Sequence, residues 1–236
     1  MRSVFSPGIV ICLCVLFVLP LPAAATPAIT CHCFTDRSFD PGSPAKADPY
    51  FLATTQNSFF ALLFTADKKD IVMKKQQGIS SDDLWIAYAV ASESCSSPEL
   101  LLKVKKNSAT WTDVLTPSDA LGVRFSAALK ARSSSAQLAA AVVDELFRRH
   151  KVLAGPELTA LRQAGATSQE LVLAAVLSAR TRQPARQIFQ KVKKGSATWG
   201  ALLQTAKIDT RNMQQEISGI LQLNPKSVAR RACGEG

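Results

Sequence analysis

The chain has 236 residues, of which 47% are hydrophobic, and its net charge at neutral pH is +10. This apolar content excludes a wholly disordered chain, and the length is sufficient for one substantial core or two small ones. Up to Ser118 acidic and basic residues are equally numerous, so the whole positive excess lies from Asp119 onward.

The first residues have the pattern of an export signal. Arg2 is followed by an apolar run from Ile9 to Leu19 and by the small residues Ala23–Ala25. The alternative is an uncleaved anchor, but the run is shorter than the roughly 20 residues of a spanning helix. We therefore expect a signal peptide over residues 1–25 and a periplasmic or secreted mature protein.

Residues 26–47 contain Pro41, Gly42 and Pro44 and show no helical pattern, so they predict an irregular N-terminal arm. Once the signal is removed, an even number of cysteines remains in an oxidising compartment, which favours two disulfides. The candidates are Cys31, Cys33, Cys95 and Cys233. Four cysteines allow three pairings, and the sequence does not choose among them.

Cys31, His32 and Cys33 form the one cluster with side chains that could bind a metal or act in redox chemistry. The cluster lacks the two-residue spacing of zinc knuckles and thioredoxin-type motifs, and no c-type haem motif is present. Structural disulfides are the preferred interpretation, a metal or redox role is the alternative, and no cofactor is expected.

The uncharged stretch from Tyr50 to Ala66 is interrupted by the polar run Thr54–Ser58. It predicts a buried helix rather than a membrane span, so no transmembrane segment is expected in the mature chain.

An internal repeat is the strongest signal in the sequence. Lys103–Trp111 and Lys191–Trp199 are identical except at one position, where Asn107 replaces Gly195. Because chance does not explain this match, we interpret the chain as two tandem copies of one multi-helix unit.

The repeat register and the turn-forming residues divide the chain into segments. Repeat unit 1 is predicted over residues 48–132, repeat unit 2 over 133–224, and a basic tail over 225–236. No stretch alternates with the period of a strand, so the predicted fold class is all-α, with five or six short helices in each unit.

Equivalent places in the two units carry helix-terminating and helix-starting residues. Ser80 and Thr167 each precede an acidic residue at capping-box spacing. Ser108 and Ser196 are the expected caps of the helices that contain the repeated tryptophans. Gly78 and Gly165 are expected to end the preceding helices in a left-handed conformation.

Three short motifs resemble those of a known kind of protein: Leu161–Gly165, Glu170–Leu171 and Gly195–Trp199. The segment from Glu157 to Ile208 resembles a tri-helical segment of uncharacterised secreted and periplasmic bacterial helical-repeat proteins; residues 70–121 match it more weakly. The resemblance implies a helical fold and export, and it transfers no activity and no binding residues.

The lysines of the repeated segments could form two equivalent sites for phosphate, anionic lipid headgroups or polyanionic glycans. They are Lys103, Lys105, Lys106, Lys191, Lys193 and Lys194. The preferred interpretation is solvated helix ends, where cations suit the helix dipole. Trp111 and Trp199 are interpreted as wedges between helices.

No catalytic residue is assigned, because only His32 and His150 could serve as imidazole bases and no nucleophile or phosphate-loop motif occurs. The preferred hypothesis is a non-catalytic exported module that binds a protein or an anionic cell-envelope component. An enzyme with its site between the two units is the alternative. Export argues against nucleic acid as a partner, and the oligomeric state is left open.

Overall fold

The computed structural model describes residues 44–223, and within this range every regular element is helical. The α-helices are α1 (Pro44–Phe64), α2 (Lys68–Gln76), α3 (Ser81–Ser94), α4 (Pro98–Lys106), α5 (Val123–Lys130), α6 (Ser135–Arg149), α7 (Gly155–Gln163), α8 (Ser168–Thr181), α9 (Ala185–Lys193), α10 (Trp199–Thr205) and α11 (Met213–Leu221). Three short 3₁₀ helices are η1 (Trp111–Asp113), η2 (Asp119–Leu121) and η3 (Thr210–Asn212). The predicted all-α class is confirmed for this part of the chain.

The buried helix predicted between Tyr50 and Ala66 is present as α1, and the polar run Thr54–Ser58 lies fully buried inside it. The helix begins at Pro44, inside the segment predicted to be an irregular arm. A proline is tolerated in a first helical turn because its missing N–H would have no intrahelical partner there. None of the helices between residues 44 and 223 is long and apolar enough to cross a bilayer.

The predicted helix ends are mostly confirmed. Gly78 and Gly165 have φ values of +89° and +84°, and the Thr167 hydroxyl forms a capping box with Glu170. The prediction that Ser108 and Ser196 cap the helices that follow them is wrong, because their hydroxyls donate to carbonyls at the end of the preceding helix. The capping residues are instead threonines two positions later, directly before the repeated tryptophans.

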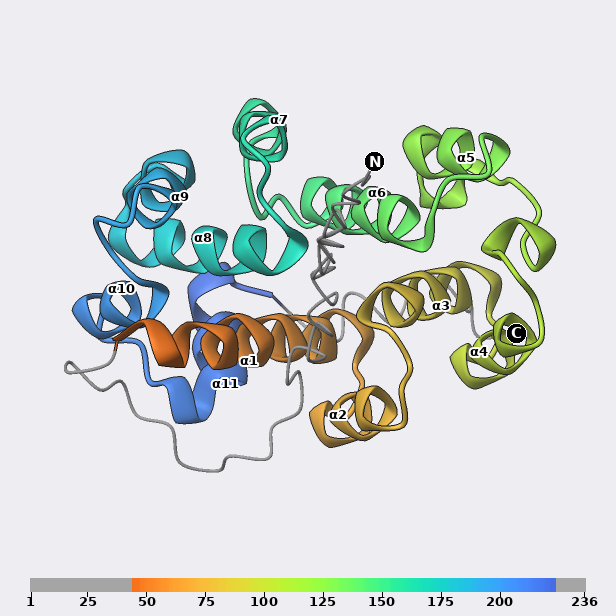
Figure 1. Cartoon of the computed structure of the whole chain (residues 1–236), viewed down its shortest axis with the longest axis horizontal. Coiled ribbons are helices and arrows are strands. Elements are labelled where there is room, and N and C mark those ends of the chain that lie inside the picture. The colour runs from red at the N-terminus through yellow and green to blue at the C-terminus, as the bar shows by residue number, and fades with distance from the viewer. Residues whose placement is uncertain (1–43, 224–236) are drawn as a thin grey trace, which may run out of the picture.

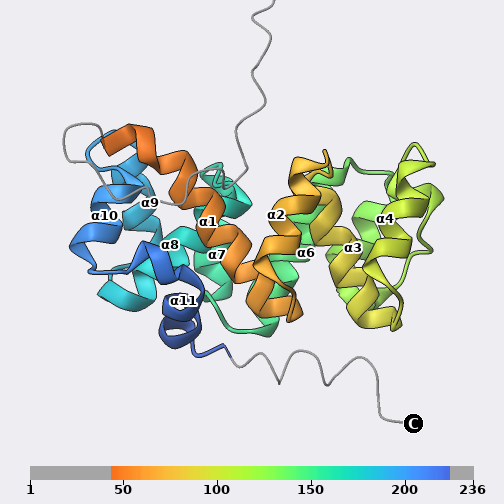
Figure 2. The same cartoon turned by 90° about the horizontal axis from the view of Figure 1, so that it is seen from below.

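The helices form two groups that lie side by side (Figures 1 and 2). In the first group α6 packs against α3 and α5, and α4 packs against α3. In the second group α1 packs against α8, α10 and α11, and α9 packs against α7 and α8. Helix α1 therefore belongs spatially with the C-terminal helices, while α6, which starts just after the predicted boundary between the units, packs against helices of the first unit.

Aromatic side chains join the two groups where α1 passes the first one. The ring of Phe59 lies edge-on to Phe147 of α6 at a centroid distance of 5.5 Å and contacts Trp85 of α3 at 6.4 Å. Phe60 contacts Trp85 edge-on at a centroid distance of 4.7 Å. Phe59 and Phe147 are fully buried, so the apolar core runs continuously through both groups.

The centre of α1 also makes polar contacts with both groups. The Gln56 Oε1 accepts hydrogen bonds from Ser81 Oγ at 3.3 Å and from Gln169 Nε2 at 3.0 Å. Ser81 begins α3 and Gln169 lies in the first turn of α8, two helices of 14 residues each. A buried amide satisfied from both sides fixes the position of α1 between the two helix starts.

Candidate functional site

The two lysine clusters predicted to be equivalent have different surroundings. Lys103, Lys105 and Lys106 line a cavity of about 580 Å³ at the surface between α4 and the α2–α3 turn. In the second cluster Lys191 donates to the side chain of Gln183, and Lys193 lies over the ring of Phe189. Lys194 is the exposed residue after α9. Of the two lysine clusters, only the first therefore lines this cavity.

Trp111 and Trp199 are 1% and 2% exposed, so their predicted role as wedges between helices is confirmed. The Trp111 Nε1 donates to Asp83 Oδ1 at 2.7 Å and ties η1 to the start of α3.

Cys95 is exposed and ends α3 in a left-handed conformation with a φ of +51°. The other predicted disulfide partners, Cys31, Cys33 and Cys233, lie outside the described residues, as does His32. Between residues 44 and 223 no three His, Cys, Asp or Glu side chains gather as they would around a metal ion.

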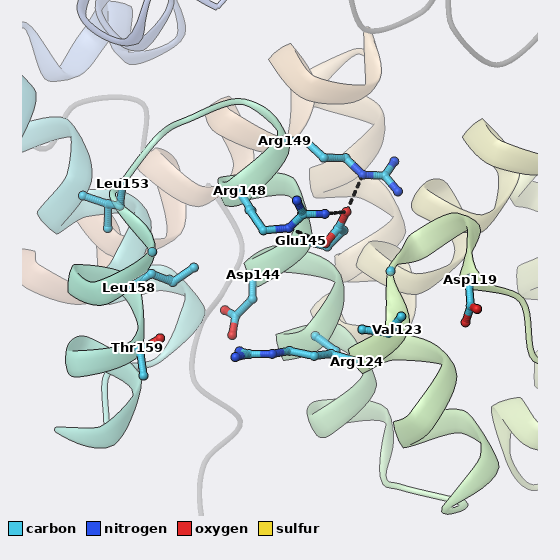
Figure 3. Close-up of a pocket in the computed structure, with 13 residues that line it drawn as sticks. Asp119, Val123, Arg124, Asp144, Glu145, Arg148, Arg149, Leu153, Leu158 and Thr159 are labelled. Carbon is cyan, nitrogen blue, oxygen red and sulfur yellow. Dashed lines mark hydrogen bonds and ion pairs between the residues drawn. The ribbon is translucent and has the colours of Figure 1, made fainter.

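Acidic and basic side chains also line a cleft of about 630 Å³ between α5, α6 and α7 (Figure 3). Its back wall is α6, with Asp144, Glu145 and Arg148, and α5 contributes Val123 and Arg124. The apolar side chains of Leu153, Leu158 and Ala141 also line it. None of these residues belongs to a site predicted from the sequence.

Glu145 is the most heavily bonded carboxylate in the cleft. It accepts from Arg148 Nε at 3.0 Å and from Arg149 Nε at 2.7 Å, which are i,i+3 and i,i+4 neighbours on α6. Burial alone would raise its pKa, but the hydrogen bonds from the two arginines outweigh this and hold the pKa of Glu145 below its usual value. The carboxylate is thus ionised and occupied by guanidinium groups at neutral pH.

Arg149 connects Glu145 to the first group of helices. Its guanidinium also bonds the carboxylate of Glu93 at the end of α3 and the carbonyl oxygen of Ala120 in η2. Because three separate segments are bonded by one side chain, this arginine fixes η2 and the start of α5 against α6.

Asp144 is also paired within the protein. Its Oδ1 accepts from Arg162 Nε of α7 at 2.8 Å, and the same guanidinium donates to the Ala166 carbonyl and the Ser168 hydroxyl. Both side chains are largely buried, at 14% and 20% exposure. This ion pair sets the width of the cleft, because it links the α6 wall to the α7 wall.

One cationic group of the cleft, Arg124, differs from these paired ones. Arg124 is exposed, and Figure 3 shows its side chain crossing the cleft from α5 without any drawn hydrogen bond or ion pair. Arg148 has a side chain that is 68% exposed at the mouth, although it contacts Glu145. The neighbouring Val123 is 71% exposed. The cleft therefore presents guanidinium groups next to an exposed apolar side chain.

The pairs on α6 had a signal in the sequence, because Glu145, Arg148 and Arg149 have the spacing of helical ion pairs. No sequence signal indicated that α5 and α7 also line the cleft, because that depends on how distant helices pack. Comparison with known proteins adds no assignment, because no family model, curated protein or solved structure matches this chain.

Proposed function

We propose that this protein is a non-catalytic helical binding module that holds an acidic, partly apolar segment of a partner protein in the α5–α6–α7 cleft. One observation carries the proposal. The inner carboxylates Asp144 and Glu145 are neutralised by the protein's own arginines, while Arg124 crosses the cleft with no partner among residues 44–223.

The chemistry of the lining fits a peptide better than a small polar metabolite. A guanidinium binds a carboxylate through two parallel hydrogen bonds, which makes Arg124 suitable for an acidic side chain. Val123, Leu153 and Leu158 offer apolar contacts in the same cleft. Its volume of about 630 Å³ lies within the range of ligand pockets, and the basic second half of the chain would steer an acidic partner toward it.

The same bonding argues against acid–base catalysis in the cleft. A general acid at neutral pH needs a raised pKa, whereas the pKa of Glu145 is lowered. The oxygens of Asp144 and Glu145 already accept hydrogen bonds from guanidinium groups. The remaining carboxylate, Asp119, points away from the centre of the cleft in Figure 3.

The tandem duplication, the export and the disulfides belong to the same proposal. The duplication is supported by helix lengths: α2 and α7 each have 9 residues, α3 and α8 each have 14, and α4 and α9 each have 9. Sequencing the N-terminus of the mature protein tests cleavage after about Ala25. Thiol labelling of the same material tests the two disulfides, which two or more reactive thiols would rule out.

A labelled short peptide of alternating glutamate and leucine tests the binding function. We expect saturable binding by fluorescence anisotropy, weakened about tenfold or more by Arg124→Gln, since a charge-assisted hydrogen bond contributes about 1.5–3 kcal/mol. Lys130→Gln is the matched control, because it removes the same charge from the exposed far end of α5 and should leave the affinity within about twofold.

Equal losses in the two variants would mean that net charge alone holds the peptide, and the cleft would not be its site. Anionic phospholipid vesicles form a second arm of the experiment. If the vesicles bind with the Arg124 dependence and the peptide does not, the partner is a membrane surface and the peptide proposal is wrong.

A further inference from the structure

A second cavity, of about 310 Å³, lies on the other side of the η2–α5 segment from the α5–α6–α7 cleft. We call it the α3–α4 pocket; its wall is mainly apolar. The apolar side chains that line it are Val90, Leu101, Val114, Leu115, Leu121 and Phe125. Leu121 and Phe125 are almost fully buried, and the other four are half-buried.

A proline accounts for the open side of this pocket. After Trp199 the chain continues as α10 for 7 residues, and Leu203 is fully buried. After Trp111 the helix stops after one 3₁₀ turn, before Pro117. Proline disfavours the helical conformation of the residue before it and supplies no N–H to an earlier carbonyl. Leu115, which occupies the position of Leu203 in the repeat, is left half-buried.

Helix α4, on the opposite wall of the pocket, is also poorly buried. Its counterpart α9 buries Ile188 and Phe189, which are 2% and 1% exposed, whereas α4 has no fully buried residue. Leu101 therefore lies at the pocket edge. The pocket is thus a part of the first group where the apolar side chains do not fill the space between the helices.

Three of the four polar side chains that line the pocket already have partners. Glu93 is bonded by Arg149, the Ser94 hydroxyl donates to the Val90 carbonyl, and the Ser118 hydroxyl caps η2. A ligand that entered would gain little from polar or charged groups of its own. An apolar cavity of about 150 Å³ binds benzene in another protein, so this pocket has room for about two aromatic rings.

We infer that the α3–α4 pocket is a binding site for a small neutral apolar molecule, of the size of two aromatic rings or a medium-length hydrocarbon chain. The site is separate from the proposed peptide cleft and does not depend on it. The lining apolar side chains supply the affinity through burial of the ligand surface, and the size of the pocket limits the ligand.

The neutral fluorescent probe N-phenyl-1-naphthylamine tests this inference on the full chain, because its emission rises in apolar surroundings and it carries no charge for the basic protein to attract. We expect one saturable site. Val114→Phe, which places a larger side chain in the pocket, should weaken probe binding tenfold or more. Leu202→Phe is the matched control, because Leu202 is the repeat counterpart of Val114 in α10, and the affinity should stay within about twofold.

Leu101→Phe fills the pocket from the α4 side and provides a second test if Val114→Phe does not fold. Absence of saturable probe binding to the unaltered protein would overturn the inference. So would equal affinities of the filled variants and the unaltered protein. Competition of the probe by the glutamate–leucine peptide, with the same loss in Val114→Phe, would instead assign the pocket to an apolar side chain of the peptide partner.

Discussion

Gly122 and Glu145 show how closely α5 and α6 approach each other at the cleft. Gly122 has a φ of +87°, and a Cβ built on it would lie 2.7 Å from the Glu145 Oε2. Gly165 also has a positive φ, of +84°, but a Cβ there would meet nothing within 4 Å. A side chain at position 122 would therefore meet steric contact in addition to backbone strain, whereas one at position 165 would meet backbone strain alone.

Gly122→Ala should cost more stability than Gly165→Ala. Both variants incur a backbone cost of about 1–3 kcal/mol, because a positive φ is unfavourable for alanine. Only Gly122→Ala also displaces Glu145 from its arginines, which should add at least about 1 kcal/mol to the loss of unfolding free energy in urea titrations. Equal losses would show that Glu145 moves aside without consequence for the cleft.

Lys75 and Asn57 repeat the geometry of Arg162 and Asp144. Lys75 Nζ donates to Asn57 Oδ1 at 2.6 Å, and both pairs join the end of a 9-residue helix to the long helix that precedes it. An amide does not offset the lysine's charge as a carboxylate would. Burial accordingly lowers the pKa of Lys75 from 10.5 to about 8, and the negative charge of Asp82 opposes this shift only in part.

This pKa predicts a pH dependence of stability. Between about pH 8 and pH 10.5 the unfolded chain retains the Lys75 proton that the folded chain has lost, so stability rises with pH across this window. The unaltered protein should therefore gain unfolding free energy relative to Lys75→Met between pH 8 and pH 10. Urea titrations of both proteins measure the difference, and a difference that is constant with pH would contradict the shift.

The sequence predicted the local features of single residues better than the site. The box between Thr167 and Glu170 and the left-handed Gly78 and Gly165 depend on neighbouring residues only, and they are confirmed. Ser108 was assigned as a cap because serine is a common capping residue, but the threonine next to Trp111 takes that role. The cleft could not be predicted, because Arg124 and Asp144 line one cavity only after α5, α6 and α7 have packed.

At the scale of elements, α10 and η1 show how one residue changes a repeated segment. Pro117 stands where the second copy has Thr205, the last residue of α10. The helical periodicity of both copies is similar, so the sequence predicted equivalent helices after both tryptophans. The structure instead has a helix of 7 residues in the second copy and a single 3₁₀ turn in the first.

We expect Thr205→Pro to destabilise α10 and Pro117→Thr to stabilise the segment that follows Trp111. Thr205→Pro removes an amide from the last turn of α10 and should cost up to about 3 kcal/mol. Pro117→Thr should allow η1 to extend, so that amide exchange at Thr116 slows; the Val114 and Leu115 N–H groups already donate to the Trp111 carbonyl. Hydrogen exchange measured by mass spectrometry reports both segments. Unchanged exchange in Pro117→Thr would show that the proline does not limit this helix.

At the scale of the whole molecule, the helices that group together in the structure differ from those that group together in the predicted repeat units. The predicted repeat units place α1 with the helices that follow it in the sequence. In the structure α1 packs against α8, α10 and α11, and α6 takes the corresponding place beside α3. Each group is thus completed by a long helix that lies in the other half of the sequence repeat.

Helix α1 also supplies a capping carboxylate to the start of α10, in the second group. The carboxylate of Asp48 accepts hydrogen bonds from the backbone N–H groups of Trp199 and Gly200 at 3.0 Å and 2.8 Å, at the start of α10. Phe51 and Leu63 of α1 are fully buried. Loss of α1 would therefore remove both a helix cap and a large part of the core.

A chain that begins at Asp67, without α1, should fold incompletely. We expect its second group, α8 to α11, to exchange amide hydrogens rapidly, while α3 to α6 retain protection because α6 is still present. A peptide of residues 44–65 added in trans should restore the protection, since it supplies the missing buried face, and the same peptide with Phe51→Glu should not. If the shortened chain instead unfolds in one transition at the temperature of the full chain, α1 does not close the second group, and the two halves fold independently of it.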